Sequence, residues 1–142
     1  MIDMKKIIKV IVVVVATVIC CNIYKNIPVR YSDSDYIEFS KAITLNNITE
    51  IRTSHNNIIT SPEDISAIIQ FLSSNSVAEL KKRDHLPNES PDFSLRLKSE
   101  DFERKIMLYG SCYVLIQQGD DTFVRYKIKN ENFFHDLQEI LN

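Results

Sequence analysis

The 142-residue chain has little glycine and little cysteine, and each shortage excludes a class of protein. Two glycines are too few for a Gly-rich phosphate-binding loop, which needs several at fixed spacing. Three cysteines, two of them adjacent, cannot form the disulfide framework of a small secreted scaffold. Hydrophobic residues make up 44% of the chain and charged residues 25%, which excludes disorder throughout. One small folded domain is the expectation.

Positive charge is also scarce outside the N-terminus. The whole chain has 17 lysines and arginines against 19 aspartates and glutamates, for a net charge of −2. Three of the lysines fall within the first 24 residues, and the remainder holds 14 basic against 18 acidic residues. A mildly acidic body argues against a nucleic-acid partner.

One long run without charge stands near the N-terminus. Residues 10–21 contain Thr17 as their single polar residue and follow three lysines, Lys5, Lys6 and Lys9. A helix over residues 7–24 would span about 27 Å, close to the ~30 Å hydrocarbon core of a bilayer. The pattern predicts an N-terminal membrane anchor (or uncleaved signal) in residues 1–24, which contacts the membrane through residues 7–24.

Two other fates of this segment stay open. Signal-peptidase cleavage requires small residues before the cut, and no such pattern follows the run. Lipoprotein processing requires a small residue before the acceptor cysteine, whereas Cys20 follows Ile19 and Cys21 follows Cys20. We therefore favour an uncleaved anchor. The excess of lysine before the run predicts a single-pass plasma-membrane protein with a cytoplasmic N-terminus and an extracytoplasmic C-terminal domain.

Residues 25–46 are predicted to be a tether or an arm that packs on the domain. Pro28 stops any continuing helix, and residues 31–35 are polar. Four apolar side chains are too many for a free linker, and a short helix over residues 34–44, capped by Ser34, would use them: Ile37, Phe39, Ile43 and Leu45.

Residues 47–142 are predicted to form an extracytoplasmic α+β domain. Residues 48–52 and 58–60 indicate a hairpin, and Ser61-Pro62-Glu63-Asp64 predicts a capping box at the start of a helix that ends near residue 75. Residues 76–92 contain two prolines and predict no regular element in their second half. Alternating patterns predict strands over residues 93–98, 102–109, 112–117 and 123–128, and a final helix follows over residues 131–141. We expect a single antiparallel sheet of about 5–6 strands with two helices packed on one face.

No pattern in the chain predicts catalysis, a metal or a small-molecule cofactor. The histidines His55, His85 and His135 are far apart, and none has metal-ligand spacing to a cysteine or carboxylate. Cys112 follows Gly110-Ser111 and leaves a thiol enzyme as an open alternative, since a thiol nucleophile needs a base that the sequence does not identify. A small buried side chain is the favoured interpretation of Cys112.

The polar face of the predicted sheet is the candidate binding surface. Aromatic rings provide contact area at low entropic cost, and arginines beside them resemble the composition of protein interfaces. Cross-strand pairing that only stabilises the sheet is the alternative. The predicted partner-binding residues are Arg96, Tyr109, Tyr113, Phe123 and Arg125.

Residues 48–141 carry a family resemblance, above all in the Ile-Thr-Ser-Pro-Glu-Asp-Ile run (59–65) that enters a helix before a strand meander. Together with the basic start and apolar span, this pattern resembles small membrane-anchored or lipoprotein-like extracytoplasmic domains of unknown function from low-GC Gram-positive bacteria. The resemblance implies an exported location and transfers no catalytic residue. Some proteins of this plan hold an immunity domain at the membrane.

Three hypotheses about function follow from the sequence. The favoured one is a membrane-tethered, non-catalytic domain that binds another protein, with immunity against a secreted toxin as its most concrete form. The second is a small accessory or sensor subunit of a membrane complex, in which the anchor itself carries specificity. The third is a thiol enzyme that uses Cys112.

Overall fold

A computed structural model describes residues 3–142, which form two compact units, residues up to Arg30 and residues from Tyr31 onward. Met1 and Ile2, which begin the predicted anchor, lie outside the described residues. We call the second unit, residues 31–142, the body.

The first unit is a single helix, α1 (Met4–Asn26), 23 residues long. Asp3 caps it, since its carboxylate accepts a hydrogen bond from the Lys5 amide at 3.0 Å. The helix reaches a mean hydropathy of 2.5 and is long and apolar enough to cross a membrane. None of its side chains is buried within the protein.

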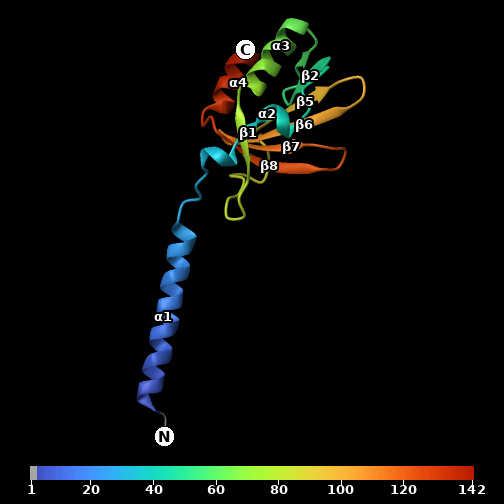
Figure 1. The fold of residues 1–142 in the computed structure, drawn as a ribbon. Helices are drawn as coiled ribbons and strands as arrows, with labels where there is room; N and C mark the ends of the chain where they lie inside the picture. Colours follow the sequence, from blue (N-terminus) through green and yellow to red (C-terminus); the bar gives the residue numbers. More distant parts are fainter. Residues whose placement is uncertain (1–2) are drawn as a thin grey trace. The chain divides into compact units, whose positions relative to one another are not determined.

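The body contains one antiparallel sheet in the order β1-β4-β8-β7-β6-β5-β2-β3 (Figure 1). The α+β class and the single antiparallel sheet are confirmed, but the sheet has eight strands and not five or six. The strands are β1 (Ile37–Glu38), β2 (Glu50–Thr53), β3 (Ile58–Ile59), β4 (Ser76–Glu79), β5 (Phe93–Lys98), β6 (Glu103–Tyr109), β7 (Tyr113–Gln117) and β8 (Phe123–Ile128).

The two strands beyond the predicted number are β1 and β4. Strand β4 has four residues, of which Val77 and Ala78 are both fully buried, so it lacks the alternation that indicates a strand in sequence. Strand β1 has two residues that pair with β4, Ile37 opposite Val77. Both strands exist because β8 offers β4 an edge for pairing, from Val77–Ile128 to Glu79–Tyr126. Local sequence carries no trace of such long-range pairing.

Helices cover one face of the sheet. They are α2 (Phe39–Ala42), α3 (Pro62–Ser73) and α4 (Phe133–Leu141), and their buried residues join the inward residues of the strands in one core. The Phe133 ring lies 6.2 Å from Phe39 and 5.1 Å from Phe71, so it joins all three helices. Helix α3 begins where predicted, but the Ser61 side chain makes no capping hydrogen bond, so the predicted capping box is absent.

Residues 31–46 belong to the body. The predicted helix over residues 34–44, capped by Ser34, is not formed: a short 3-10 helix, η1 (Asp33–Asp35), with Ser32 at its N-cap, precedes β1, and α2 begins only at Phe39. Phe39, Ala42, Ile43 and Leu45 are all buried in the core. The segment that sequence patterns describe as a tether or packing arm therefore contributes a strand, a helix turn and four core residues.

Candidate functional site

The five predicted partner-binding residues all lie on the face of the sheet that the helices leave open, here called the outer face. Strand register shows this directly, because Tyr109 pairs with Tyr113, and Arg125 and Phe123 follow on β8 opposite Leu115 and Gln117. Arg96 pairs with Lys105 on the same face. Directly paired residues project to the same side of a sheet, so the alternation predicted from sequence places these side chains together.

Two of the five residues are covered by the body itself. Tyr109 is 5% exposed, and Tyr113 is half-buried. The β4–β5 loop, residues 80–92, lies over this end of the outer face. A Cβ built on Gly110 would lie 3.1 Å from Cγ of Pro87, and Gly110 has φ +62°. Glycine is thus needed at the β6–β7 turn both for its backbone conformation and for the close approach of the loop.

Asp84 is the centre of this covered region. Its carboxylate accepts a hydrogen bond from the Tyr31 hydroxyl at 2.7 Å and from the Tyr113 hydroxyl at 3.3 Å. One loop carboxylate therefore joins the segment that begins the body to strand β7. Sequence analysis missed Asp84 and Tyr31, since 53 residues separate them and neither lies in a recognisable motif.

The tyrosine hydroxyls in this region are held in their neutral form. Burial, followed by the nearby negative charge of Asp84, raises the pKa of Tyr113 to about 12. Burial also raises the pKa of Tyr31. The hydrogen bond to Asp84 and the negative charge of Asp84 act in the same direction. A neutral phenol can donate to Asp84, so these raised pKa values keep the hydrogen bonds intact across the physiological range.

Phe123 and Arg125 line an open groove of about 430 Å³ between the β4–β5 loop and β8, whereas Arg96 lines a separate hollow beside Glu103. Lys82, Asp84 and His85 line the groove from the loop, and Phe123 and Arg125 line it from the strand. Phe123 is 45% exposed, which is unusual for a phenylalanine in this body. The half-buried side chains of Met107 and Leu115 lie in the same row of the outer face as Arg125, because Leu115 pairs with Arg125 and Met107 pairs with Leu115. We call the surface of Arg96, Met107, Leu115, Phe123 and Arg125 the outer-face patch.

Ion pairs fill the far end of the outer face. Arg96 pairs with Glu103 at 3.0 Å and Arg52 with Glu50 at 3.3 Å. Both arginine side chains are about half exposed, and such surface pairs contribute little to stability. Each carboxylate holds the guanidinium group of its arginine in place. The other N–H donors of that group face solvent.

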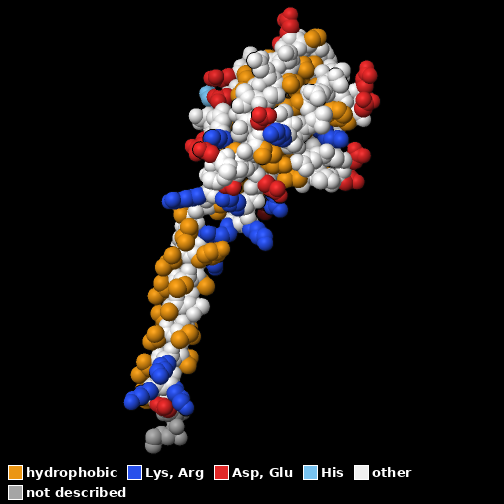
Figure 2. Space-filling view, in the orientation of Figure 1, with side chains coloured by type: hydrophobic (Ala, Val, Ile, Leu, Met, Phe, Trp, Pro, Cys, Tyr) orange, Lys and Arg blue, Asp and Glu red, His pale blue; other side chains and the backbone are white. Residues whose placement is uncertain are grey.

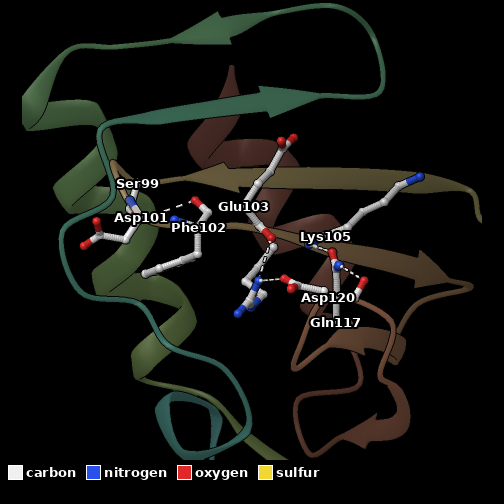
Figure 3. A network of polar contacts seen from close by, with 8 residues as sticks. Ser99, Asp101, Phe102, Glu103, Lys105, Gln117 and Asp120 are labelled. Atoms are coloured by element: carbon white, nitrogen blue, oxygen red, sulfur yellow. Dashed lines mark hydrogen bonds and ion pairs between the residues drawn. The ribbon is translucent and has the colours of Figure 1, made fainter.

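A polar network next to these pairs holds the strand ends in place (Figure 3). The Gln117 side chain accepts from the Lys105 amide at 3.0 Å and donates to the Asp120 carbonyl at 2.9 Å. At the β5–β6 turn, the Ser99 hydroxyl accepts from the amides of Asp101 and Phe102, each at 3.2 Å. The Ser99 bonds close the β5–β6 turn, and Gln117 joins β6 to the turn that leads into β8.

The groups considered for chemistry lie apart. His55, His85 and His135 are all exposed, and among residues 3–142 no set of three His, Cys, Asp or Glu side chains is arranged to hold a metal ion. Cys112 is 7% exposed and belongs to the core cluster. Its thiol is thus nearly inaccessible, and the outer face is the better candidate site.

Comparisons with known proteins give little further information. No protein-family model matches the chain, and no curated protein matches it in sequence. Among solved structures, the chain is similar to the crystal structure of a Clostridium perfringens protein provisionally described as a lipoprotein. The identity is 16%, the match covers 74% of this chain and 93% of the other, and the TM-score is 0.48. At this level the likeness carries no conclusion about function.

Proposed function

We propose that the protein is a membrane-tethered binding domain whose outer-face patch receives another protein. The observation that carries this proposal is the groove of about 430 Å³, in which a 45% exposed phenylalanine lies beside Arg125 and the lysine and carboxylate groups of the loop. Exposed aromatic and arginine side chains next to a rigid strand are the composition of interface hot spots. The groove also accepts polar groups, since Lys82 and Asp84 line it with opposite charges.

The tether in this proposal is α1. A helix that is apolar on all sides needs apolar surroundings, and the side chains of α1 from Val10 to Val15 are 50% to 64% exposed within the protein. Its 23 residues extend about 35 Å, enough to cross a ~30 Å hydrocarbon core. Lys5, Lys6 and Lys9 at its start favour a cytoplasmic N-terminus, which leaves the body outside the plasma membrane.

Immunity against a secreted toxin is the most concrete form of the proposal. A body held outside the membrane meets such a toxin before the toxin reaches the bilayer. The resemblance to membrane-anchored domains from low-GC Gram-positive bacteria supports the location. In this form the outer-face patch binds the toxin directly, and the anchor serves only to concentrate the body at the surface. An accessory subunit would instead depend on the sequence of residues 7–24.

Site-specific photo-crosslinking tests the proposal in the native membrane. A photoreactive amino acid replaces Phe123 in one strain and Ile58 in another, and crosslinked species are identified by mass spectrometry. Ile58 is the matched control, because it is a 55% exposed apolar residue on strand β3 at the edge of the sheet beyond β2. We expect one discrete crosslinked protein at position 123 and none at position 58. No crosslink at 123, or the same species at both positions, would contradict the proposal.

Alanine variants then connect the contact to affinity. Phe123→Ala and Arg125→Ala should each weaken capture of the crosslinked partner at least tenfold, as expected for hot-spot residues that lose about 1.4 kcal/mol or more. Both side chains are exposed, so the free energy of unfolding should change by less than about 1 kcal/mol. Ile58→Ala should leave capture unchanged. Tyr113 is unsuitable for this test, because its hydroxyl bonds to Asp84 and its loss would also destabilise the fold.

A further inference from the structure

The end of the body that includes the β4–β5 loop carries a concentration of positive charge. The side chains are Lys81, Lys82 and Arg83 on the loop and Lys127 and Lys129 at the end of β8. We call them the basic cluster. Strand pairing brings the two segments together, since the Leu80 amide donates to the Arg125 carbonyl at 2.9 Å. Figure 2 shows lysine and arginine side chains gathered at the end of the body where this loop lies in Figure 1.

This concentration stands out against the charge of the whole body. Residues 31–142 hold 12 lysines and arginines against 18 aspartates and glutamates. The basic cluster has five of those cations, and four acids contact its members or lie beside them: Asp33, Asp35, Glu79 and Asp84. The rest of the body therefore holds seven cations against 14 acids. This end has a small excess of positive charge and the remainder is strongly negative, so charge is unevenly distributed over the body.

The cluster is built onto the segment that begins the body. Lys129 pairs with Asp33 at 3.2 Å, and Lys81 pairs with Asp35 at 3.1 Å. The ammonium groups of Lys81 and Lys127 lie 5.0 and 5.1 Å from the centre of the Tyr31 ring. Both contacts are within cation–π range. Tyr31 is thus surrounded by the cluster at the point where the chain enters the body.

The length of the chain keeps this entry point near the anchor. Only residues 27–30 separate the last residue of α1 from Tyr31. Five residue steps span at most roughly 17 Å, in whatever direction the body points. If α1 spans a membrane, Tyr31 and the cations around it stay close to the headgroup layer. A tether of this length limits distance but does not by itself select an orientation.

We propose that the basic cluster docks on the anionic lipid headgroups of the membrane that holds α1. The inference rests on the proposed anchor and goes beyond the protein-binding function. A negative leaflet attracts each nearby lysine or arginine, about fivefold in population per residue, and repels the acidic remainder of the body. The two effects favour the same orientation. Docking turns the loop side of the groove, with Lys82, toward the lipid and leaves Phe123 and Arg125 on the strand side accessible to a partner.

Lysine acetylation of the intact chain tests this orientation without any substitution. The full chain is reconstituted into vesicles of phosphatidylcholine alone and into vesicles with about 30% phosphatidylglycerol, and a membrane-impermeant acetylating reagent is added. Lys41 and Lys98 are the internal references, since both are exposed and lie outside the basic cluster. Ratios within one molecule remove any effect of mixed insertion. No other protein is present, so protection cannot come from an acidic protein partner.

The expected result is selective protection by anionic lipid. Acetylation of Lys82 and Lys129, relative to Lys98, should slow by about threefold or more in the phosphatidylglycerol vesicles. The difference should vanish at about 0.5 M NaCl, because the Debye length then falls to a few ångströms. Equal ratios in the two lipids, or equal protection of Lys41 and Lys98, would overturn the proposal. Failure of the chain to float with vesicles would instead reject the anchor, so the two failures are distinguishable.

A charge-reversal pair supplies the second measurement. Lys82→Glu with Lys129→Glu should remove the lipid-dependent protection of Lys81 and Lys127, whereas Lys41→Glu with Lys98→Glu should preserve it. All four side chains are exposed, so both variants should fold. Retained protection in the Lys82 and Lys129 variant would contradict docking through this cluster.

Discussion

At the scale of the residue, Asp84 determines how much of the outer face is open. It lies on a loop and accepts hydrogen bonds from tyrosines that come from two other segments. The contact holds residues 80–92 against one end of the sheet and leaves Phe123 and Arg125 uncovered at the other. The covering loop thus separates a structural half of the outer face from the half proposed to bind a partner.

Removing the hydroxyls that bind Asp84 should destabilise the body in a coupled manner. Tyr31→Phe and Tyr113→Phe should each lower the free energy of unfolding by about 1 kcal/mol, since a hydrogen bond to a charged group is lost at a half-buried site. The double variant should lose more than the sum, because each single variant leaves Asp84 one tyrosine donor and the double variant leaves it neither. Urea unfolding of the full chain in detergent measures these changes. Tyr36→Phe is the control, since the described residues offer its hydroxyl no hydrogen bond.

The same tyrosines should make stability fall at alkaline pH. The pKa of Tyr113 rises to about 12 in the folded state from an ordinary value of 10. The unfolded chain therefore releases this proton at a lower pH than the folded chain does. The stabilisation is complete below pH 10 and is lost as pH rises from 10 to about 12. Comparison of unfolding curves at pH 9 and about 11.5 should show a smaller loss for Tyr113→Phe than for the natural chain. If both chains lose the same free energy of unfolding between these pH values, ionisation of Tyr113 is not the cause of the loss.

Residue-level predictions from sequence succeeded where alternation decided the outcome. The period of two along β5 to β8 places Arg96, Phe123 and Arg125 on one face without any tertiary knowledge. It could not show that Tyr109 is 5% exposed, because the covering loop comes from a distant segment. Their role in binding a partner stays a prediction.

At the scale of the element, residues 31–46 are the part most changed by the structure. Apolar side chains in this segment indicated packing, but not a strand at the edge of the sheet. The Phe39 amide donates to the Asn75 carbonyl at 3.0 Å, so the segment is held by the turn between α3 and β4 as well as by β4 itself. The body therefore begins at Tyr31, and only residues 27–30 separate it from α1 in the chain.

Replacement of Phe39 tests whether this segment is integral. Phe39 is fully buried against Phe133, and Phe39→Ala should cost about 3–5 kcal/mol through lost burial and the cavity that remains. Ile37→Ala, two residues earlier and 41% exposed, should cost less than about 1 kcal/mol. Thermal and urea unfolding measure both. If Phe39→Ala lowers the free energy of unfolding by less than about 1 kcal/mol, the segment is a tether and not an integral part of the body.

At the scale of the whole molecule, α1 and the body follow different physical rules. The side chains of α1 need apolar surroundings, whereas the body buries its apolar residues internally and exposes four large ones: Ile37, Ile58, Phe123 and Ile140. The body therefore removes most of its large apolar side chains from water by folding, whereas α1 exposes its apolar side chains and is long and apolar enough to cross a membrane.

Protease access should report the predicted topology. In protoplasts, added protease should degrade the body, and Lys82 and Lys98 provide exposed trypsin sites in it. A tag on the N-terminus should survive until the membrane is permeabilised, because the lysines before α1 favour retention in the cytoplasm. The reverse pattern would show an inverted protein. Release of the whole chain into the medium would indicate cleavage rather than anchoring.

The sequence by itself determined the apolar helix, the α3 and α4 helices and the six strands with turn residues between them. Each depends on local periodicity, which short-range sterics and burial impose on consecutive residues. Tertiary structure decided the pairing of β4 with β8, the addition of β1, and the cover that the β4–β5 loop places over Tyr109 and Tyr113. These features join segments tens of residues apart, and their energies come from contacts that no local pattern encodes. The groove beside Phe123 lies between that loop and β8, so it too depends on the tertiary structure.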